Sequence, residues 1–196
     1  MLEYEREQLN NRDSEYISIG ITENGQRLSA FNIPWEQTAH AFNMKIPDVF
    51  LSPEDLKDEK LMEQIRSFHV VGCYVLTPID DYSFIAGLPE LFDIYLANAT
   101  KLGNLSFLSG LGEWSMLHIS GAHLQDLNAI AESAKIQRFF PVYCFSFAGC
   151  KIEDISALNA VPRISELIIV GEDDEAERRR WKSINAGTFR YYKIQE

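Results

Sequence analysis

The sequence predicts an α/β fold in which short repeated units stack side by side and share one parallel sheet. Two observations carry this prediction: a seven-residue phrase that occurs four times, and a short alternating segment before each copy. The phrases begin at Ile79, Leu102, Leu124 and Ile152, in steps of 23, 22 and 28 residues. Each has Asp or Asn in third place. Recurrence at such a period is typical of a solenoid, because one unit can bury its apolar face only against its neighbours.

The alternating segments before the phrases are predicted strands. In each, the first and third residues are expected to point inward and the middle one outward, as in a half-buried strand. These segments are residues 71–73, 94–96, 117–119, 145–147 and 167–169. The Asp or Asn of each phrase is expected to cap a turn, and the Ser or Asn two residues later to cap a short helix or 3₁₀ turn. A further inward residue follows at Leu88, Leu111 and Val161, where the third unit has Ser133.

Both ends of the stack are predicted to carry caps. Counting back 22 residues from 71 gives a candidate first strand at 48–51, and Ser52-Pro53-Glu54-Asp55 is a helix start, with the helix running to about Phe68. Asn24-Gly25 between apolar alternations predicts a hairpin of 15–21 and 26–31. Counting forward predicts a helix near 174–184 and a last strand at 188–194. The expected divisions are a polar segment 1–14, an N-terminal cap 15–67, repeats 68–171 and a C-terminal cap 172–196.

The repeat resembles the short leucine-rich repeat of bacterial internalin-like proteins. The best match is the unit at 145–161, FSFAGCKIEDISALNAV, and the resemblance covers about residues 68–171. It implies a right-handed solenoid with a parallel concave sheet and a helical or 3₁₀ convex side. The sequence departs from the family where a ladder of Asn is usual, since Leu76, Ala99, Ala122 and Cys150 occupy those positions. The step of 28 implies extra residues, expected within 134–141, where Phe139-Phe140-Pro141 is a candidate contact or a fold-back over the core.

Composition excludes several classes of function. The chain has 196 residues and a net charge of −11, and its one basic cluster, 178–180, follows a run of acids. On a helix, Asp174 with Arg178 and Glu175 with Arg179 are i,i+4 pairs, so a solvated, salt-bridged face is expected rather than a nucleic-acid site. No apolar run approaches the roughly 20 residues of a membrane helix. The polar start and three cysteines, an odd number without Cys-x-x-Cys spacing, predict a cytoplasmic protein with reduced thiols.

The outward residues of the strands are the predicted partner-binding face. They form three columns across the sheet, which are small, mildly apolar and nearly uncharged, as suits a protein contact. One column is expected to hold Val70, Asp93, Met116, Cys144 and Glu166, the next Gly72, Tyr95, His118, Ser146 and Ile168, and the third to begin with Tyr74. The candidate contact residues are Tyr74, Asp93, Tyr95, Met116, His118, Ser146, Glu166 and Ile168. The alternative is a short sheet face that meets only solvent or loops.

Other chemistry finds weaker support in the sequence. A Cys144–His118 dyad oriented by Asp93 lacks an oxyanion site, and His118, His123 and Cys144 lack paired zinc-ligand spacing. Asp81, Asn104, Asp126 and Asp154 fit turn capping better than a calcium ladder. We therefore expect no metal, cofactor, small-molecule substrate, nucleic acid or membrane partner. The predicted function is a non-enzymatic protein-binding module. The alternatives are an acidic inhibitor or immunity-type protein that neutralises a basic partner, and a cysteine-dependent enzyme.

Overall fold

The computed structural model describes residues 15–27, 47–88, 90–136 and 142–194. Within these ranges the chain is an α/β structure with an eight-stranded sheet, in the order β10-β9-β7-β5-β4-β3-β1-β2. Every neighbouring pair of strands in it is parallel. The predicted segments 1–14 and Phe139-Phe140-Pro141 lie outside the described residues.

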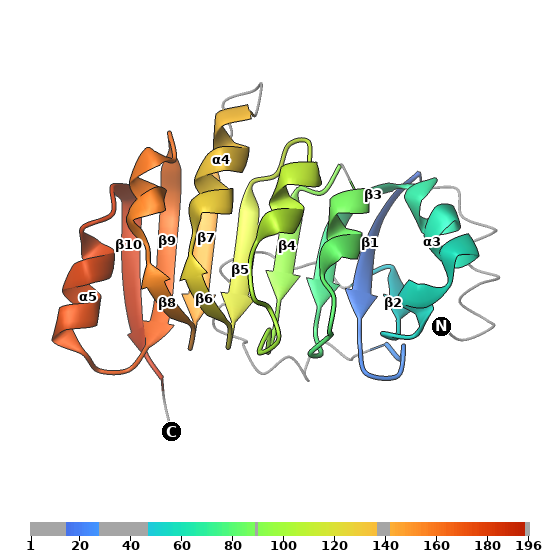
Figure 1. The fold of residues 1–196 in the computed structure, drawn as a ribbon, viewed down its shortest axis with the longest axis horizontal. Coiled ribbons are helices and arrows are strands. Elements are labelled where there is room, and N and C mark those ends of the chain that lie inside the picture. Colours follow the sequence, from blue (N-terminus) through green and yellow to red (C-terminus); the bar gives the residue numbers. More distant parts are fainter. Residues whose placement is uncertain (1–14, 28–46, 89, 137–141, 195–196) are drawn as a thin grey trace.

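Short strands alternate with helical segments along the chain (Figure 1). The large sheet is built from β1 (Tyr16–Ile21), β2 (Val49–Leu51), β3 (His69–Val75), β4 (Asp93–Leu96), β5 (Met116–Ser120), β7 (Tyr143–Ala148), β9 (Ile164–Gly171) and β10 (Ala186–Lys193). A second, two-stranded sheet pairs β6 (His123–Asp126) with β8 (Lys151–Asp154). The helical segments are η2 (Asp55–Lys57), α3 (Glu59–Arg66), η3 (Ser83–Gly87), η4 (Ser106–Gly110), α4 (Asn128–Ile136), η5 (Ser156–Ala160) and α5 (Glu175–Lys182).

The register between the predicted strands is confirmed from β4 to β10. Ile94, Leu117, Phe145 and Leu167 lie level with one another on four successive strands, and Phe189 follows on β10. For β3 the predicted register is wrong by two residues, because Cys73 and not Val71 pairs with Ile94. Tyr74 therefore lies level with Tyr95, and Gly72 with Asp93.

The N-terminal end differs from the prediction in its strand order. The segment 48–51 does form a strand, β2, but β1 lies between it and β3, with Ile19 level with both Val49 and Cys73. The Asn24-Gly25 turn is present, with Gly25 at φ 70°. The predicted hairpin is nevertheless wrong in its first arm, because β1 has parallel partners on both edges and no free edge for 26–31. Residues 28–31 of that second arm lie outside the described part of the chain.

The predicted N-terminal helix begins as expected but is interrupted. Asp55 Oδ2 accepts from the Ser52 amide at 2.7 Å, and the Asp55 amide donates back to Ser52 Oγ at 3.3 Å, which is a capping box. The one-turn η2 ends at Asp58, whose side chain then accepts from the Leu61 amide and starts α3. Leu61 and Ile65 are buried on the inner face of α3, as predicted.

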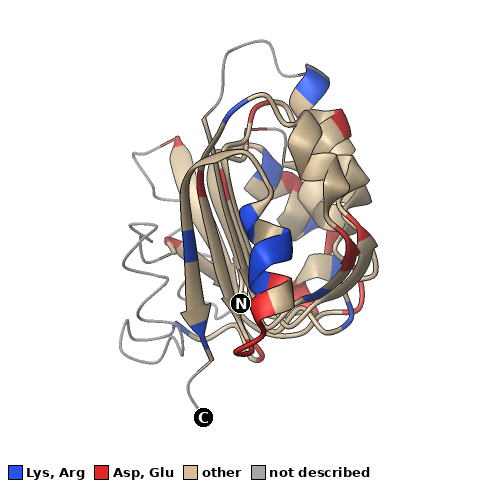
Figure 2. Cartoon of the chain, turned by 90° about the vertical axis from the view of Figure 1, so that its left-hand side faces the viewer, with Lys and Arg blue, Asp and Glu red and all other residues tan. Residues whose placement is uncertain are grey.

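The main core lies between the large sheet and the row of helical segments that covers one of its faces (Figures 1 and 2). The inward strand residues, such as Ile94, Leu117 and Phe145, are fully buried there. The predicted turn caps are confirmed: the side chains of Asp81, Asn104, Asp126 and Asp154 each accept from the amide two residues later, at 2.8–2.9 Å. Each unit thus carries its own local turn signal. The predicted helix caps from the following Ser are wrong for η3, η4 and η5, because that Ser is the first residue of each turn and the residue before it makes no side-chain cap bond.

Ser133 has a specific role where the other units have an aliphatic residue. Its hydroxyl accepts from Trp114 Nε1 at 2.8 Å and donates to the Leu108 carbonyl at 3.2 Å. Both Ser133 and Trp114 are buried. The polar residue is needed there because a buried indole N–H without a partner is unfavourable.

The C-terminal helix, α5, is hydrogen-bonded to the smaller sheet through Arg180. Asp174 caps α5 by accepting from the amides of Ala176 and Glu177. Arg180 turns inward and donates from Nη2 to the carbonyls of Ile152 and Glu153, both at 2.7 Å. These carbonyls belong to β8, which pairs on one side with β6. Of the two expected i,i+4 ion pairs, Glu175–Arg179 is present at 3.6 Å. Asp174 instead caps the helix and forms no ion pair with Arg178 among the described residues. Arg180 is half-buried and pairs with Glu177 at 3.1 Å.

The described helices include none long and apolar enough to cross a membrane. All three cysteines, Cys73, Cys144 and Cys150, are free, as expected from their number and spacing.

Candidate functional site

The sheet face opposite the main core holds the predicted contact residues, and most of them are buried. Tyr74, Tyr95, His118, Ser146 and Ile168 form one column across β3, β4, β5, β7 and β9. Tyr95 and His118 are only 1% and 2% exposed, and Ser146 is fully buried. Tyr74, Tyr95 and Ala97 form a second hydrophobic cluster on this face. The expectation of an exposed column was wrong, because alternation reveals which residues leave the core but not whether something else covers them.

The neighbouring column, nearer the start of the strands, is partly exposed. Asp93, Met116, Cys144 and Glu166 lie level with one another there. All four are of intermediate burial. Three of the eight predicted contact residues, namely Asp93, Met116 and Glu166, are thus at least partly accessible.

The buried column contains three polar side chains, Tyr95, His118 and Ser146, and burial changes their ionisation and hydrogen bonding. The His118 ring stacks on the Tyr95 ring. Burial lowers the pKa of His118 to about 3, so its imidazole is neutral near pH 7. The hydroxyls of Tyr95 and Ser146 have no hydrogen-bond partner among the described residues.

Asp93 is a half-buried carboxyl at the border of this face. It accepts a hydrogen bond from the Tyr74 hydroxyl at 2.9 Å. Burial raises the pKa of Asp93 to about 6, and the hydrogen bond from Tyr74 opposes that rise only in part. The same pair shifts the phenol, since burial and the nearby Asp93 charge raise the pKa of Tyr74.

Two alternative sites were weighed from the sequence, a Cys144–His118 dyad and a zinc site of His118, His123 and Cys144, and the structure supports neither. His118 lies level with Ser146, whereas Cys144 lies level with Met116. Burial, and then the Glu166 charge, raises the pKa of the Cys144 thiol. His123 belongs to the smaller sheet, where it pairs with Glu153 at 3.3 Å. Within the described ranges, no three His, Cys, Asp or Glu side chains are grouped as a metal site.

A cleft that the sequence did not reveal opens at the carboxyl ends of the last strands of the sheet. Its volume is about 690 Å³, and it lies where β7, β9 and β10 end, between β8 and α5. Its apolar floor includes Phe147, Ile152, Ile169 and Trp181, all buried. The rings of Phe147 and Trp181 stack with centroids 5.4 Å apart. The floor is therefore held by the main core.

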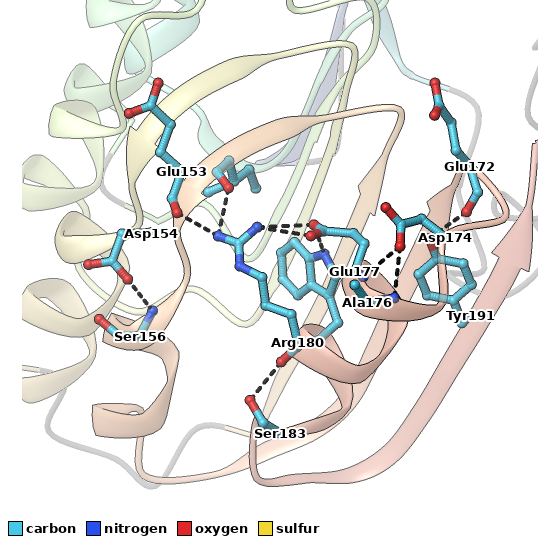
Figure 3. Close-up of polar contacts among 12 residues, drawn as sticks. Glu153, Asp154, Ser156, Glu172, Asp174, Ala176, Glu177, Arg180, Ser183 and Tyr191 are labelled. Atoms are coloured by element: carbon cyan, nitrogen blue, oxygen red, sulfur yellow. Dashed lines mark hydrogen bonds and ion pairs between the residues drawn. The ribbon is translucent and has the colours of Figure 1, made fainter.

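A network of hydrogen bonds fixes one wall of this cleft (Figure 3). Glu177 accepts from Trp181 Nε1 at 2.8 Å and from Arg180 Nη1 at 3.1 Å. Arg180 in turn holds the β8 carbonyls, so the helix, the floor and the smaller sheet are connected through two side chains. Across the cleft, the Tyr191 hydroxyl donates to the Glu172 carbonyl at 2.7 Å.

The rim of the cleft is acidic. Glu153, Glu172, Asp174 and Glu177 line it, against Lys151 and Arg180. Because Arg180 is paired with Glu177, three carboxylates face one remaining cation. The electrostatic effect reaches Tyr191, whose pKa is raised first by burial and then by Glu177, Asp174 and other carboxylates nearby. Acidic residues gather at the start of α5 in Figure 2.

The signal for this cleft was present in the sequence as the acidic run at 172–177. It pointed equally to an ordinary solvated helix face. The cleft becomes visible only in the structure, where β8 lies beside α5 and Arg180 lines the space between them while it donates to the Ile152 carbonyl.

The chain matches none of the known protein-family models, and no curated protein proved to be a relative.

Proposed function

We propose that this chain is a non-enzymatic protein-binding module, built as a leucine-rich-repeat solenoid. The observation that carries the proposal is the level alignment of successive units: equivalent apolar residues on β4, β5, β7 and β9 face one core. Each unit also has an Asx turn followed by a helical segment. Such stacks hold side chains on rigid strands, so that a partner can bind at little cost in ordering entropy.

Three features support a binding role over a catalytic one. The Cys144 thiol has a raised pKa, whereas a nucleophilic thiol needs a lowered one. The His118 imidazole is 2% exposed and a very weak base. The two residues also occupy different levels of the sheet. The free cysteines support a reducing, cytoplasmic setting.

A second candidate function is an acidic inhibitor, or immunity-type protein, that neutralises a basic partner. The observation that favours it is the cleft beside α5, whose rim concentrates carboxylates of a chain with net charge −11. Negative clefts accelerate the association of cationic partners and raise their specificity, with a strong dependence on salt.

The test is affinity capture of partners from a lysate of cells that express the chain, followed by reconstitution with the purified candidate. We expect one protein to form a stoichiometric complex on size-exclusion chromatography with light scattering. Cys144→Ser should bind this protein as tightly as the parent does. A chain that forms no stoichiometric complex would contradict the proposal.

Thiol reactivity separates the binding module from the cysteine-dependent enzyme. With iodoacetamide at neutral pH, Cys144 should react no faster than a free cysteine, because its thiol is the less ionised of the two. Cys73→Ser and Cys150→Ser isolate the signal of Cys144. A rate well above that of free cysteine, abolished by His118→Gln, would support the enzyme instead.

A further inference from the structure

We infer that the cleft between β8 and α5 binds a lysine- or arginine-bearing segment of a partner protein. This inference rests on the proposed protein-binding function and adds the location of the contact and the chemistry of the partner. The cleft, of about 690 Å³, is within the size range of about 300–1,000 Å³ that is usual for sites enclosing small groups.

The floor and the rim of the cleft complement different parts of such a segment. The floor is apolar and suits the methylene stem of a long basic side chain or an adjacent aliphatic residue. The rim offers carboxylates to the cationic group. The carboxylates of Glu153 and Glu172 turn away from the Arg180–Glu177 pair, on opposite sides of it (Figure 3). An amphipathic basic residue therefore complements both layers.

The carboxylates of the rim are only partly neutralised within the chain. Glu177 is matched by Arg180, and Asp174 is engaged with the first amides of α5. Glu172 forms no ion pair with any residue of the described ranges, and the partner of Glu153 is His123, which carries charge only when protonated. Neither Glu153 nor Glu172 forms an ion pair with a Lys or Arg side chain of the described ranges, so both carboxylates can pair with a cationic ligand.

The cleft is also fixed before any ligand arrives. Arg180 joins α5 to two carbonyls of β8, and Tyr191 joins β10 to the segment after β9. Trp181 is held by both the Phe147 ring and the Glu177 carboxylate. A preformed cleft binds more tightly than a loose one because less conformational freedom is lost.

The experiment measures binding of a fluorescent acetylated peptide, Lys-Leu-Lys-Leu-Lys, by anisotropy. The comparison peptide has Glu in place of each Lys. We expect the basic peptide alone to bind, more weakly as salt rises from about 0.05 M to about 0.3 M. The double variant Glu153→Gln and Glu172→Gln should bind it about fivefold to tenfold more weakly.

The matched control is the double variant Glu63→Gln and Glu132→Gln, which replaces two exposed carboxylates of α3 and α4 outside the cleft. It removes negative charge without touching the cleft, so its affinity should equal that of the parent. Amide chemical-shift changes in NMR spectra should centre on Tyr191, Ile194 and the start of α5. All of these substituted side chains are exposed, so circular dichroism should report an unchanged fold.

Two outcomes would overturn the inference: no binding of the basic peptide, or equal losses for the cleft and control variants, which would mean diffuse charge attraction. The proposed function has its own readout. A stoichiometric partner complex that tolerates Glu153→Gln and Glu172→Gln would refute the cleft and leave the binding module intact. The absence of any such complex would refute the binding module itself.

Discussion

The imidazole ring of His118 stacks on the phenol ring of Tyr95, with centroids 4.2 Å apart and planes within 6° of parallel. The two residues lie level on adjacent parallel strands, β5 and β4, on the face opposite the main core. Both are almost fully buried. This face is therefore a second packed layer that contains a titratable ring, and its stability depends on pH.

Replacement of His118 by Gln should make the fold less sensitive to acid. Burial holds the pKa of His118 at about 3, against 6.5 when unfolded, so the unfolded chain binds the proton first. His118 then lowers the free energy of unfolding as pH falls from 6.5 towards 3, by up to about 1.4 kcal/mol per pH unit. Urea unfolding at a series of pH values measures the effect. As pH falls from 6.5 towards 3, the free energy of unfolding of His118→Gln should rise relative to that of the parent.

Replacement of Asp93 by Asn should have the opposite dependence. The pKa of Asp93 is raised to about 6 from 3.8, so its stabilising effect is complete below pH 3.8 and lost as pH rises through 6. Asn keeps an acceptor for Tyr74 without a charge. We expect Asp93→Asn to be more stable than the parent at pH 7 by about 1–3 kcal/mol, with the gain vanishing by pH 4. A stability difference that stays the same across this pH range would contradict the raised pKa of Asp93.

Replacement of Ser133 by Ala should destabilise the fold by about 1–3 kcal/mol, because the buried Trp114 Nε1–H loses its acceptor. Thermal and urea unfolding measure the effect. Ser109→Ala is the control, because this exposed hydroxyl donates to the Ser106 carbonyl within its own 3₁₀ turn. Its effect should stay within about 0.5 kcal/mol.

Replacement of Phe145 by Ala should cost about 3–5 kcal/mol, because it opens a cavity in the centre of the core. Phe145 is fully buried and contacts the rings of Tyr143, Trp114 and Phe147. Phe92→Ala removes the same side chain where it is 50% exposed and should cost far less. Equal losses of stability in the two variants would mean that the inward positions of the strand segments had been assigned wrongly.

The sequence was sufficient to predict the strands of the repeat and most of their register. Units with a regular step of 22–23 residues place equivalent residues level, which is why Phe189 could be aligned with Leu167 from counting alone. The register failed at β3 because alternation has a period of two. An apolar triplet at 71–73 fits the same alternation as one at 73–75, so the sequence does not separate them. In the structure Cys73 and Val75 are fully buried, whereas Val71 is only partly buried and falls at a register shift between β1 and β3.

The N-terminal order and the burial of the second face depend on interactions that the pattern does not encode. Counting back from Val71 identified β2 as a strand but assumed that sequence neighbours are sheet neighbours, and β1 lies between them. Likewise, alternation identified Tyr95 and His118 as outward residues without revealing their burial. The cleft was missed because the acidic run at 172–177 fits an ordinary solvated helix face equally well.

The Asx turns have a consequence for the ancestry of the molecule. Asp81, Asn104, Asp126 and Asp154 each close their turn through a bond to an amide two residues away, so no distant residue is required. A segment of this kind can be duplicated or deleted in frame as a block, because the residues that form its turn lie within the segment itself. Homologous chains of different length should therefore differ by whole units, each made of a strand, an Asx turn and a helical segment.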